Sequence, residues 1–133
     1  MFLTIANLLG PRDVARVQKK ADGLDWVDGT RTAGGRARAV KRNLQANLRT
    51  GPGEGLHTFL MEAITAHPVL KAAAQPARFS RLMLSRTGPG SHYGPHVDNA
   101  HVGAGEERVR TDLSFTLFLS DPASYDGGEL VVE

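Results

Sequence analysis

The spacing of the apolar residues changes near residue 78, and this change constrains the fold more than any other feature of the chain. Before it, apolar residues recur three and four positions apart, as on the buried face of a helix. After it, they alternate with polar residues, as on a strand with one buried face. Helices followed by strands on short loops favour an α+β fold, with helices packed on one face of a curved antiparallel sheet or partial barrel.

Two helices are predicted in the first half. The first begins at Gly10 and Pro11, because proline is tolerated at the first helical position, and its apolar residues fall on one face between positions 14 and 24. The second covers residues 56–67, and it ends there because the residue before a proline is pushed out of the α region. We interpret His67 as a helix-end imidazole that the helix dipole favours.

The clearest strand prediction is residues 111–120, where apolar and polar side chains alternate. Its apolar face, which we assign to the core, carries Leu113, Phe115, Leu117 and Leu119. On the other face, Asp112 and Ser114 either line a barrel interior or face solvent. Further strands are predicted at 2–5, 24–28, 79–84 and 129–132, with turns at 87–90 and 126–128 and a loop at 30–39.

Composition narrows the chemistry that the chain can carry. It has no cysteine, which excludes a disulfide scaffold, a thiolate zinc site and a cysteine nucleophile, so His, Asp or Glu must hold any metal. No apolar run approaches the roughly 20 residues that cross a bilayer, and the first residues do not read as a signal peptide. We therefore expect a cytoplasmic protein without a membrane partner.

Basic residues gather between positions 31 and 49, where six Lys and Arg residues occur without an acidic one. The stretch lacks the interleaved aromatic residues on which single-stranded nucleic acids stack. We interpret it as a solvated loop and expect no nucleic-acid partner. Whether the protein forms a homo-oligomer stays open.

His96 and Asp98 form the sharpest chemical motif. Residues two apart on a strand point to the same side, so these two side chains should converge on one ion at the rim of the sheet, within roughly 4 Å of each other. A second histidine would complete the 2-His-1-carboxylate triad of non-haem Fe(II) oxygenases. The alternative is an exposed loop pair without a ligand role.

Other polar residues near the motif are weaker candidates. His92 and His101 flank it and are each weighed as a third ligand against an ordinary loop residue. Tyr93 either lines the substrate side of the site or packs in a half-buried strand. His57 lies on the second predicted helix, away from the motif.

Several motifs together carry a resemblance to a known family. They are Val-Lys-Arg-Asn-Leu-Gln at 40–45, Ser-His-Tyr-Gly-Pro-His-Val-Asp-Asn at 91–99, Arg-Thr-Asp-Leu-Ser at 110–114 and Tyr-Asp-Gly-Gly-Glu-Leu at 125–130. With them the chain resembles the PKHD-type hydroxylases, the bacterial iron-uptake-associated (PiuC-like) branch of the prolyl-hydroxylase-like Fe(II)- and 2-oxoglutarate-dependent dioxygenases. The resemblance covers essentially the whole chain.

The resemblance implies a double-stranded β-helix, or jelly roll, preceded by helices. Residues 1–76 would form the N-terminal helical and strand region and residues 77–133 the first half of the barrel, together one structural domain. It also implies Fe(2+) held by His96 and Asp98, with 2-oxoglutarate as co-substrate and L-ascorbate as reductant. Such an enzyme oxidises 2-oxoglutarate to succinate and CO₂ while it hydroxylates a substrate that the motifs do not name.

The chain also departs from the family pattern. The family places its third iron ligand, a second His, after the Gly-Gly-Glu-Leu turn, and an Arg that pairs with 2-oxoglutarate lies further on. The chain ends at Glu133 before either, and no arginine follows Arg110. Near Arg86 and Thr87 the family often carries a Tyr that reaches 2-oxoglutarate, and Thr87 is shorter. We therefore expect the first half of a barrel with two of the three ligands.

Two other functions remain as alternatives. The chain is either a non-catalytic truncated fragment or binding module that retains the start of the fold, with its basic stretch as a partner surface, or a zinc hydrolase built on His96 and Asp98. The absence of another close-spaced histidine pair weakens the zinc alternative.

Overall fold

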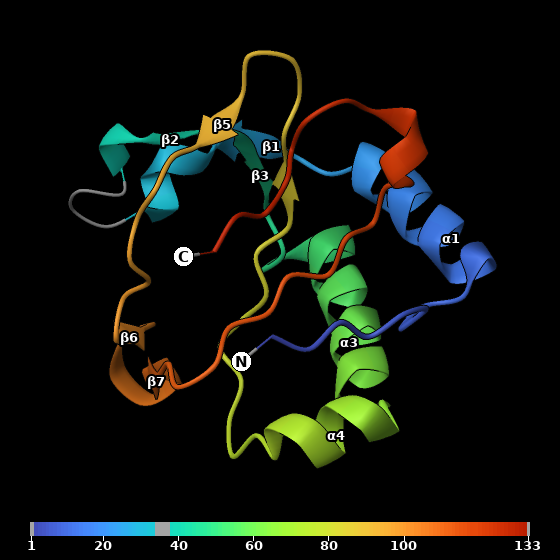
Figure 1. Cartoon of the computed structure of the whole chain (residues 1–133), viewed down its shortest axis with the longest axis vertical. Helices are drawn as coiled ribbons and strands as arrows, with labels where there is room; N and C mark the ends of the chain where they lie inside the picture. The colour runs from blue at the N-terminus through green and yellow to red at the C-terminus, as the bar shows by residue number, and fades with distance from the viewer. Residues whose placement is uncertain (1, 34–37, 133) are drawn as a thin grey trace.

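The computed structural model describes residues 2–33 and 38–132. Helices and short antiparallel strand pairs are both present, with strands between α1 and α3 as well as after α4, so the predicted α+β class is confirmed (Figure 1). The helices are α1 (Pro11–Asp22), α3 (Gly51–Ala66) and α4 (Pro68–Ala74), with 3-10 turns η1 (Gly29–Thr32), η2 (Gly105–Glu107) and η3 (Pro122–Ser124). The strands are β1 (Trp26–Asp28), β2 (Lys41–Arg42), β3 (Leu44–Ala46), β4 (Ser85–Arg86), β5 (His92–Tyr93), β6 (His101–Val102) and β7 (Val109–Arg110).

α1 forms where the first helix is predicted. Gly10 precedes it in extended backbone and Pro11 occupies the first turn, where the missing N–H of proline costs nothing. Val17 and Ala21 are buried on its inner face. The helix ends at Gly23, whose N–H bonds the carbonyl of Lys20.

α3 confirms the second predicted helix and begins five residues earlier than expected. Leu56, Leu60 and Ile64 lie on its inner face and are between 1% and 3% exposed. The helix ends at Ala66, as the following proline requires. α4, which the sequence pattern did not reveal, then begins at Pro68.

His67 lies between the two helices, at the helix end where it is predicted, and has a further role there. Its Nδ1 accepts a hydrogen bond of 3.5 Å from the N–H of Leu70, so the ring caps the start of α4. His67 therefore lies at the end of α3, as predicted, and its ring is also the N-cap acceptor of α4.

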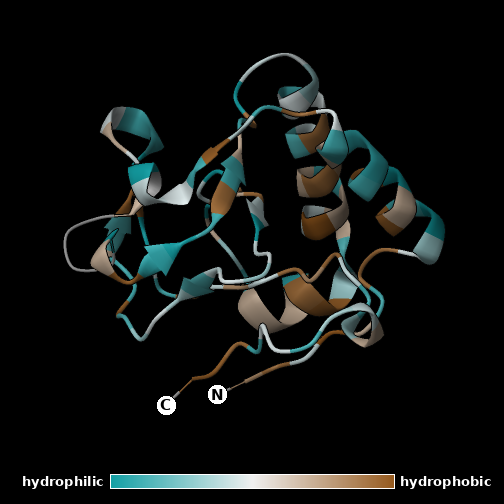
Figure 2. Ribbon diagram, turned by 90° about the horizontal axis from the view of Figure 1, so that it is seen from above, coloured by the Kyte–Doolittle hydropathy of each residue, from teal (hydrophilic) through white to brown (hydrophobic). Residues whose placement is uncertain are grey.

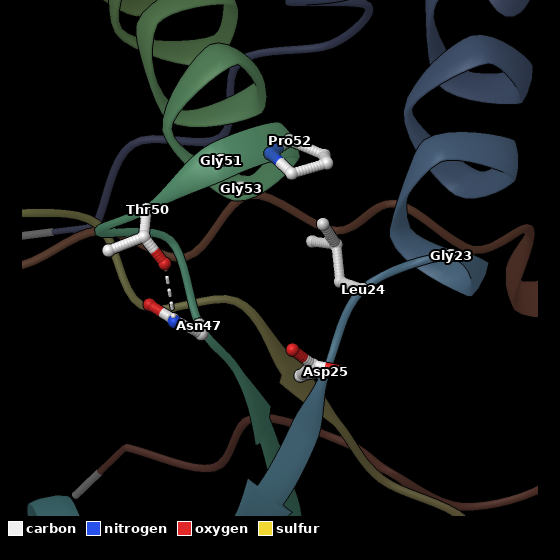
Figure 3. A pocket seen from close by; sticks show the side chains of 8 residues that line it. All are labelled: Gly23, Leu24, Asp25, Asn47, Thr50, Gly51, Pro52 and Gly53. Carbon is white, nitrogen blue, oxygen red and sulfur yellow. Dashed lines mark hydrogen bonds between the residues drawn. The ribbon is translucent and has the colours of Figure 1, made fainter.

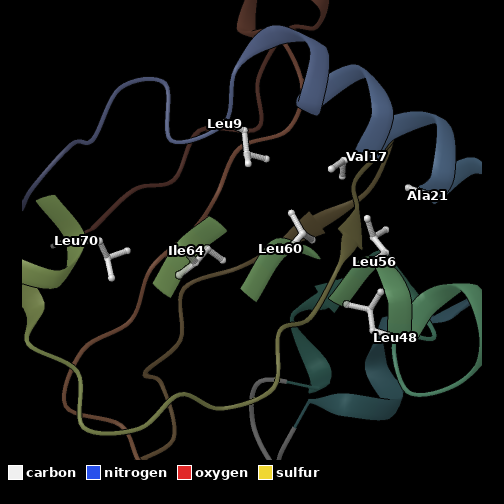
Figure 4. Close-up of a cluster of buried hydrophobic side chains, with 8 residues drawn as sticks. All are labelled: Leu9, Val17, Ala21, Leu48, Leu56, Leu60, Ile64 and Leu70. Atoms are coloured by element: carbon white, nitrogen blue, oxygen red, sulfur yellow. The ribbon is translucent and has the colours of Figure 1, made fainter. Parts of the chain in front are cut away.

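The core lies where α1 and α3 pack together (Figure 4). Figure 2 colours much of α3 as hydrophobic and most of α1 as hydrophilic. Burial of each large aliphatic side chain contributes about 1.5–3 kcal/mol, so this helix pair holds much of the stability. The buried cluster comprises Leu9, Val17, Ala21, Leu48, Leu56, Leu60, Ile64 and Leu70.

The strands form three separate antiparallel ladders within the described residues. β3 lies between β1 and β4, β2 pairs with β5, and β6 pairs with β7. In the second ladder Lys41 lies opposite Tyr93, and in the third His101 lies opposite Arg110. None of these ladders closes into a barrel, so the jelly roll and the division at residue 76 stay predictions.

Several predicted strands are wrong. Residues 2–5, 111–120 and 129–132 adopt no ladder in the described part of the chain, and residues 79–84 lead into the two-residue β4 without belonging to it. A strand requires a neighbouring backbone to accept and donate its hydrogen bonds, and apolar alternation alone does not supply one. The apolar residues at 79–84 are instead explained by burial, since Phe79, Leu82 and Leu84 pack against the core cluster without belonging to a strand.

The core assignment on residues 111–120 is partly wrong. Leu113 is 69% exposed and Phe115 is 47% exposed, because without ladder partners this face has little to pack against. Phe115 contacts the ring of Phe79 edge to face, at a centroid distance of 6.3 Å. Leu117 and Leu119 do pack against the core cluster, as predicted.

The predicted strand at 24–28 and the predicted turn at 87–90 are confirmed. The strand at 24–28 appears as β1, and the turn at 87–90 forms with a bond from the N–H of Ser91 to the carbonyl of Gly88. The predicted loop at 30–39 begins with η1, and its residues 34–37 lie outside the described residues. No helix in the described part combines the length and apolar character needed to cross a bilayer.

Candidate metal site

His96 and Asp98 lie close together just after β5. The Nε2 atom of His96 is 3.4 Å from the Oδ1 atom of Asp98, which matches the predicted approach of the two side chains. The prediction that they stand on a strand is wrong, because the ladder ends at Tyr93 and residues 96–98 pair with no strand. Their role as metal ligands stays a prediction.

The backbone at Gly94 sets the direction of the His96 ring. The Gly94 N–H bonds the carbonyl of Val40 at 2.8 Å, which extends the contact between β2 and β5 by one residue. The Gly94 carbonyl lies 2.8 Å from Nδ1 of His96. Because a carbonyl only accepts, this contact places a proton on Nδ1 and leaves Nε2 as the nitrogen that faces Asp98.

This arrangement has the chemistry of two metal donors. In the neutral ring, the Nε2 lone pair and the carboxylate oxygen of Asp98 face each other, and only a proton or a cation between them makes their approach favourable. Two bonds of about 2.1 Å that meet at 90–110° span roughly 3.0–3.4 Å, so the observed separation fits one divalent ion. A carbonyl bonded to the other ring nitrogen is a common feature of metal-binding histidines.

The pair is accessible to small molecules. The His96 side chain is 25% exposed and the Asp98 side chain 64% exposed. An ion held here would therefore keep open positions for water or co-substrate, as catalytic metal sites do. In the part of the chain that the structure describes, no group of three or more His, Cys, Asp or Glu residues gathers at one point.

Tyr93 stacks on the His96 ring, and Lys41, which sequence reasoning missed, contacts Tyr93. The rings of Tyr93 and His96 stack at 3.8 Å between centroids and 10° between planes. The Nζ atom of Lys41 lies 5.1 Å from the centroid of the Tyr93 ring. Burial raises the pKa of Tyr93, with a further contribution from Asp98, and burial lowers the pKa of Lys41.

The burial of Lys41 was not evident from the sequence, because Arg42 beside it is polar as well. Lys41, Asn43 and Gln45 alternate with other residues, and the structure buries Lys41 and Gln45 to 6% and 4% exposure. Arg42 and Leu44 between them are exposed, so burial alternates along this segment as it does along a strand. The count of basic residues across 31–49 concealed this pattern, so the interpretation as a wholly solvated loop is wrong at Lys41.

The other candidate histidines do not join the pair. His92 is exposed on β5, where it lies opposite Arg42, and His101 is exposed on β6. His57 lies on α3, and its Nε2 accepts a 3.3 Å hydrogen bond from the N–H of Leu82. Burial lowers the pKa of His57, and the nearby charge of Arg81 adds to this effect.

Of the two alternatives for Asp112 and Ser114, a barrel interior or solvent, the structure shows solvent. Both are exposed, and the guanidinium of Arg110 donates to the two carboxylate oxygens of Asp112 at 2.9 and 3.1 Å.

Arg86 contacts the carboxylate of Asp22 at 2.7 Å and the ring of Trp26 at 4.1 Å. It thereby joins β4 to the end of α1.

A small cavity of about 100 Å³ lies elsewhere, between the end of α1 and the first turn of α3 (Figure 3). Asn47 donates to the Thr50 hydroxyl at its edge, at 2.9 Å. Neither His96 nor Asp98 lines it. The cavity and the candidate metal site are therefore separate features.

The comparison with known proteins identifies the relatives of this chain. A model of the 2OG-Fe(II) oxygenase superfamily matches residues 82–133, the segment that holds His96 and Asp98. A PKHD-type hydroxylase of Hyphomonas neptunium is 48% identical over 132 residues, which are 99% of this chain and 59% of the relative. The resemblance to PKHD-type hydroxylases is confirmed.

Other PKHD-type hydroxylases match over a similar span. One from Synechococcus elongatus is 42% identical over 133 residues, and one from Paracoccus denitrificans is 41% identical over 134. They cover all or 99% of this chain, and this chain covers 60% and 59% of them. The chain thus spans about three fifths of the length of the PKHD-type hydroxylases that it matches.

Proposed function

We propose that this chain carries the iron-binding motif of an Fe(II)- and 2-oxoglutarate-dependent hydroxylase, with His96 and Asp98 as two of the ligands. The observation that carries the proposal is the 3.4 Å approach of Nε2 and Oδ1, with Nδ1 tied to Gly94. The name of the matching superfamily and the names of the relatives support it.

Each residue of the pair has a distinct task in this proposal. His96 donates a neutral lone pair, Asp98 neutralises one positive charge of the ion, and the Gly94 carbonyl keeps the proton of the ring on Nδ1. When bound, iron would activate O₂, one oxygen atom of which would enter succinate as 2-oxoglutarate loses CO₂ and the other the hydroxylated substrate. The jelly roll, the role of L-ascorbate and a link to iron uptake belong to the same proposal and depend on the resemblance alone.

With only two protein donors proposed, His96 and Asp98, we expect this chain to bind Fe(II) weakly. Residues 111–133 contain no His, Lys or Arg, so this segment offers neither a second histidine nor a cation for the distal carboxylate of 2-oxoglutarate. Arginine is suited to that carboxylate because its planar fork donates two parallel hydrogen bonds. We therefore expect the 133-residue chain to bind Fe(II) weakly and to form little succinate from 2-oxoglutarate.

A titration with Mn(II), which is stable in air, tests the ligand assignment. His96→Ala and Asp98→Ala should each weaken binding at least tenfold, because removal of either leaves a single donor. His92→Ala and Asp126→Ala are matched controls, since these exposed residues lie outside the pair, and they should bind as the parent chain does. If all four variants bind alike, the assignment of His96 and Asp98 is refuted.

An assay of succinate formation with Fe(II), 2-oxoglutarate, ascorbate and oxygen tests the activity. The expected result is little product from this chain, and none above background from its His96→Ala variant. Substantial succinate that survives His96→Ala would contradict the proposed site. Metal binding no stronger than that of His96→Ala would favour the alternative of a non-catalytic binding module.

A further inference from the structure

The ring of His96 is held by more than its backbone hydrogen bond. One edge meets the Gly94 carbonyl at 2.8 Å, and one face lies against the Tyr93 ring, nearly parallel and 3.8 Å away between centroids. Rotation that turns the ring out of its plane would break both contacts, and a half-turn about the last side-chain bond would break the hydrogen bond. The stack therefore restricts the same rotation that aims Nε2 at Asp98.

The fold brings Lys41 to the same place from a distant part of the sequence. Lys41 and Tyr93 are opposite each other in the ladder of β2 and β5, where side chains directly across from one another are neighbours on one face. The ammonium of Lys41 lies 5.1 Å from the centroid of the Tyr93 ring, within the range of a cation–π contact. Lys41 is 6% exposed whereas Tyr93 is 43% exposed, so the buried residue anchors the more exposed one.

We propose that Tyr93, anchored by Lys41, is a positioning residue that holds the His96 ring in its ligand orientation. The inference depends on the proposed metal site, because it assigns Tyr93 a role through His96 and not a contact with the ion. A ring fixed before the ion arrives loses less rotational freedom on binding, which raises affinity without any further donor.

Substitutions at Tyr93 separate its ring from its hydroxyl. Tyr93→Leu removes the stack and should weaken Mn(II) binding about tenfold, the lower end of the range for residues that orient a ligand. Tyr93→Phe keeps the ring and should stay within about twofold of the parent chain. Loss of affinity in both variants would assign the effect to the hydroxyl and overturn the stacking role.

Substitutions at Lys41 test the anchor. Lys41→Met keeps an unbranched side chain and removes the charge, and it should weaken Mn(II) binding by about two- to fivefold, as expected for one cation–π contact. Lys41→Arg keeps a cation over the ring and should restore the affinity. An affinity unchanged in Lys41→Met would remove Lys41 from the proposal.

The ring nitrogens of His96 provide a second measurement that needs no metal. In the neutral ring of the metal-free parent chain, ¹⁵N NMR should place the single proton on Nδ1, and Tyr93→Leu should move both nitrogen signals toward the average of the two tautomers. Tyr125→Leu is the matched control, because Tyr125 is 40% exposed and does not contact His96, and it should leave the signals unchanged.

The combined results distinguish the two proposals. If His96→Ala binds Mn(II) as the parent chain does, the proposed metal site fails. If His96→Ala loses binding while Tyr93→Leu keeps both the affinity and the His96 signals, the metal site stands and the positioning role is overturned. If the parent chain binds no Mn(II), unchanged His96 signals in Tyr93→Leu still overturn the positioning role.

Discussion

Gly53 lies where the first turn of α3 crosses the chain that leaves β3. A Cβ atom at this position would lie 1.9 Å from the carbonyl oxygen of Asn47, which is backbone and has little room to move. The absence of a side chain is therefore what lets the helix pack against this segment. At Gly55, two residues later in the same helix, a Cβ atom would meet nothing within 4 Å.

These two glycines give a paired prediction. Gly53→Ala should lower the free energy of unfolding by about 1–3 kcal/mol through overpacking. Gly55→Ala should raise it by about 0.5–1 kcal/mol, because alanine favours the helix more than glycine does. Urea denaturation measures both, and similar shifts in the two variants would contradict the close approach at Gly53.

His57 predicts a dependence of stability on pH. Its lowered pKa means that the folded protein holds this proton less tightly than the unfolded chain, whose ordinary value is 6.5. Stability due to His57 is therefore complete above about pH 6.5 and falls as the pH drops from there through the folded pKa. The charged groups near the ring are Arg81 and Arg49, which oppose protonation, and Glu54, which favours it.

The His57→Gln variant isolates this contribution. Glutamine does not titrate and keeps an acceptor for the N–H of Leu82, so the variant should lose less stability than the parent chain between pH 7 and pH 5. Urea midpoints at several pH values measure the difference. A difference between the two proteins that stays constant over this range would show that His57 does not cause the dependence.

At the scale of whole elements, α3 buries its apolar side chains and the segment 111–120 leaves several of them exposed. Both carry regular apolar patterns, yet Leu56 is 1% exposed and Leu113 is 69% exposed. A helix satisfies its backbone hydrogen bonds internally, so α3 needs only an apolar partner such as α1. The segment 111–120 needs the backbone of a neighbour as well, and in the described part it forms no ladder beyond the bond from the Thr111 N–H to the Ala100 carbonyl.

Alanine substitutions measure this contrast. Leu56→Ala should cost about 2–5 kcal/mol of unfolding free energy, and Leu113→Ala should change it by no more than about 0.5 kcal/mol. Phe115→Ala should fall between them, at about 1 kcal/mol, since it loses one edge contact with Phe79. Equal losses of unfolding free energy in Leu56→Ala and Leu113→Ala would show that the segment 111–120 belongs to the core after all.

Viewed as a whole, the molecule exposes large apolar side chains in its C-terminal part. The exposed set comprises Leu113, Phe115, Phe118, Leu130, Val131 and Val132, each at 47% or more. Soluble monomers seldom expose many such residues close together in sequence. Together with backbone that belongs to no ladder, they predict association between copies of the chain.

Sedimentation velocity at increasing concentration measures this association. The parent chain should form larger species, and the double variant Leu113→Lys and Val131→Lys should remain monomeric at higher concentration, because buried charges oppose an apolar contact. Val69→Lys, on the half-exposed surface of α4, is the control and should associate as the parent chain does. A monomeric parent chain at all concentrations would contradict the prediction.

Local features of the sequence determined α1, α3 and the approach of His96 to Asp98. Proline at the first turn, apolar spacing and the proline after His67 act within a few residues, so the helix positions follow without knowledge of the rest of the fold. Likewise, His96 and Asp98 are two residues apart, and that separation lets their side chains meet even though the expected strand did not form.

Tertiary structure alone decided which apolar segments are buried and what surrounds His96. Alternation predicted strands at 79–84 and 111–120, but a strand depends on hydrogen bonds to backbone elsewhere in the chain, which its own residues cannot specify. Lys41 reaches Tyr93 only because β2 and β5 pair. Such contacts join residues far apart in the sequence, and no local pattern of side chains encodes the partner.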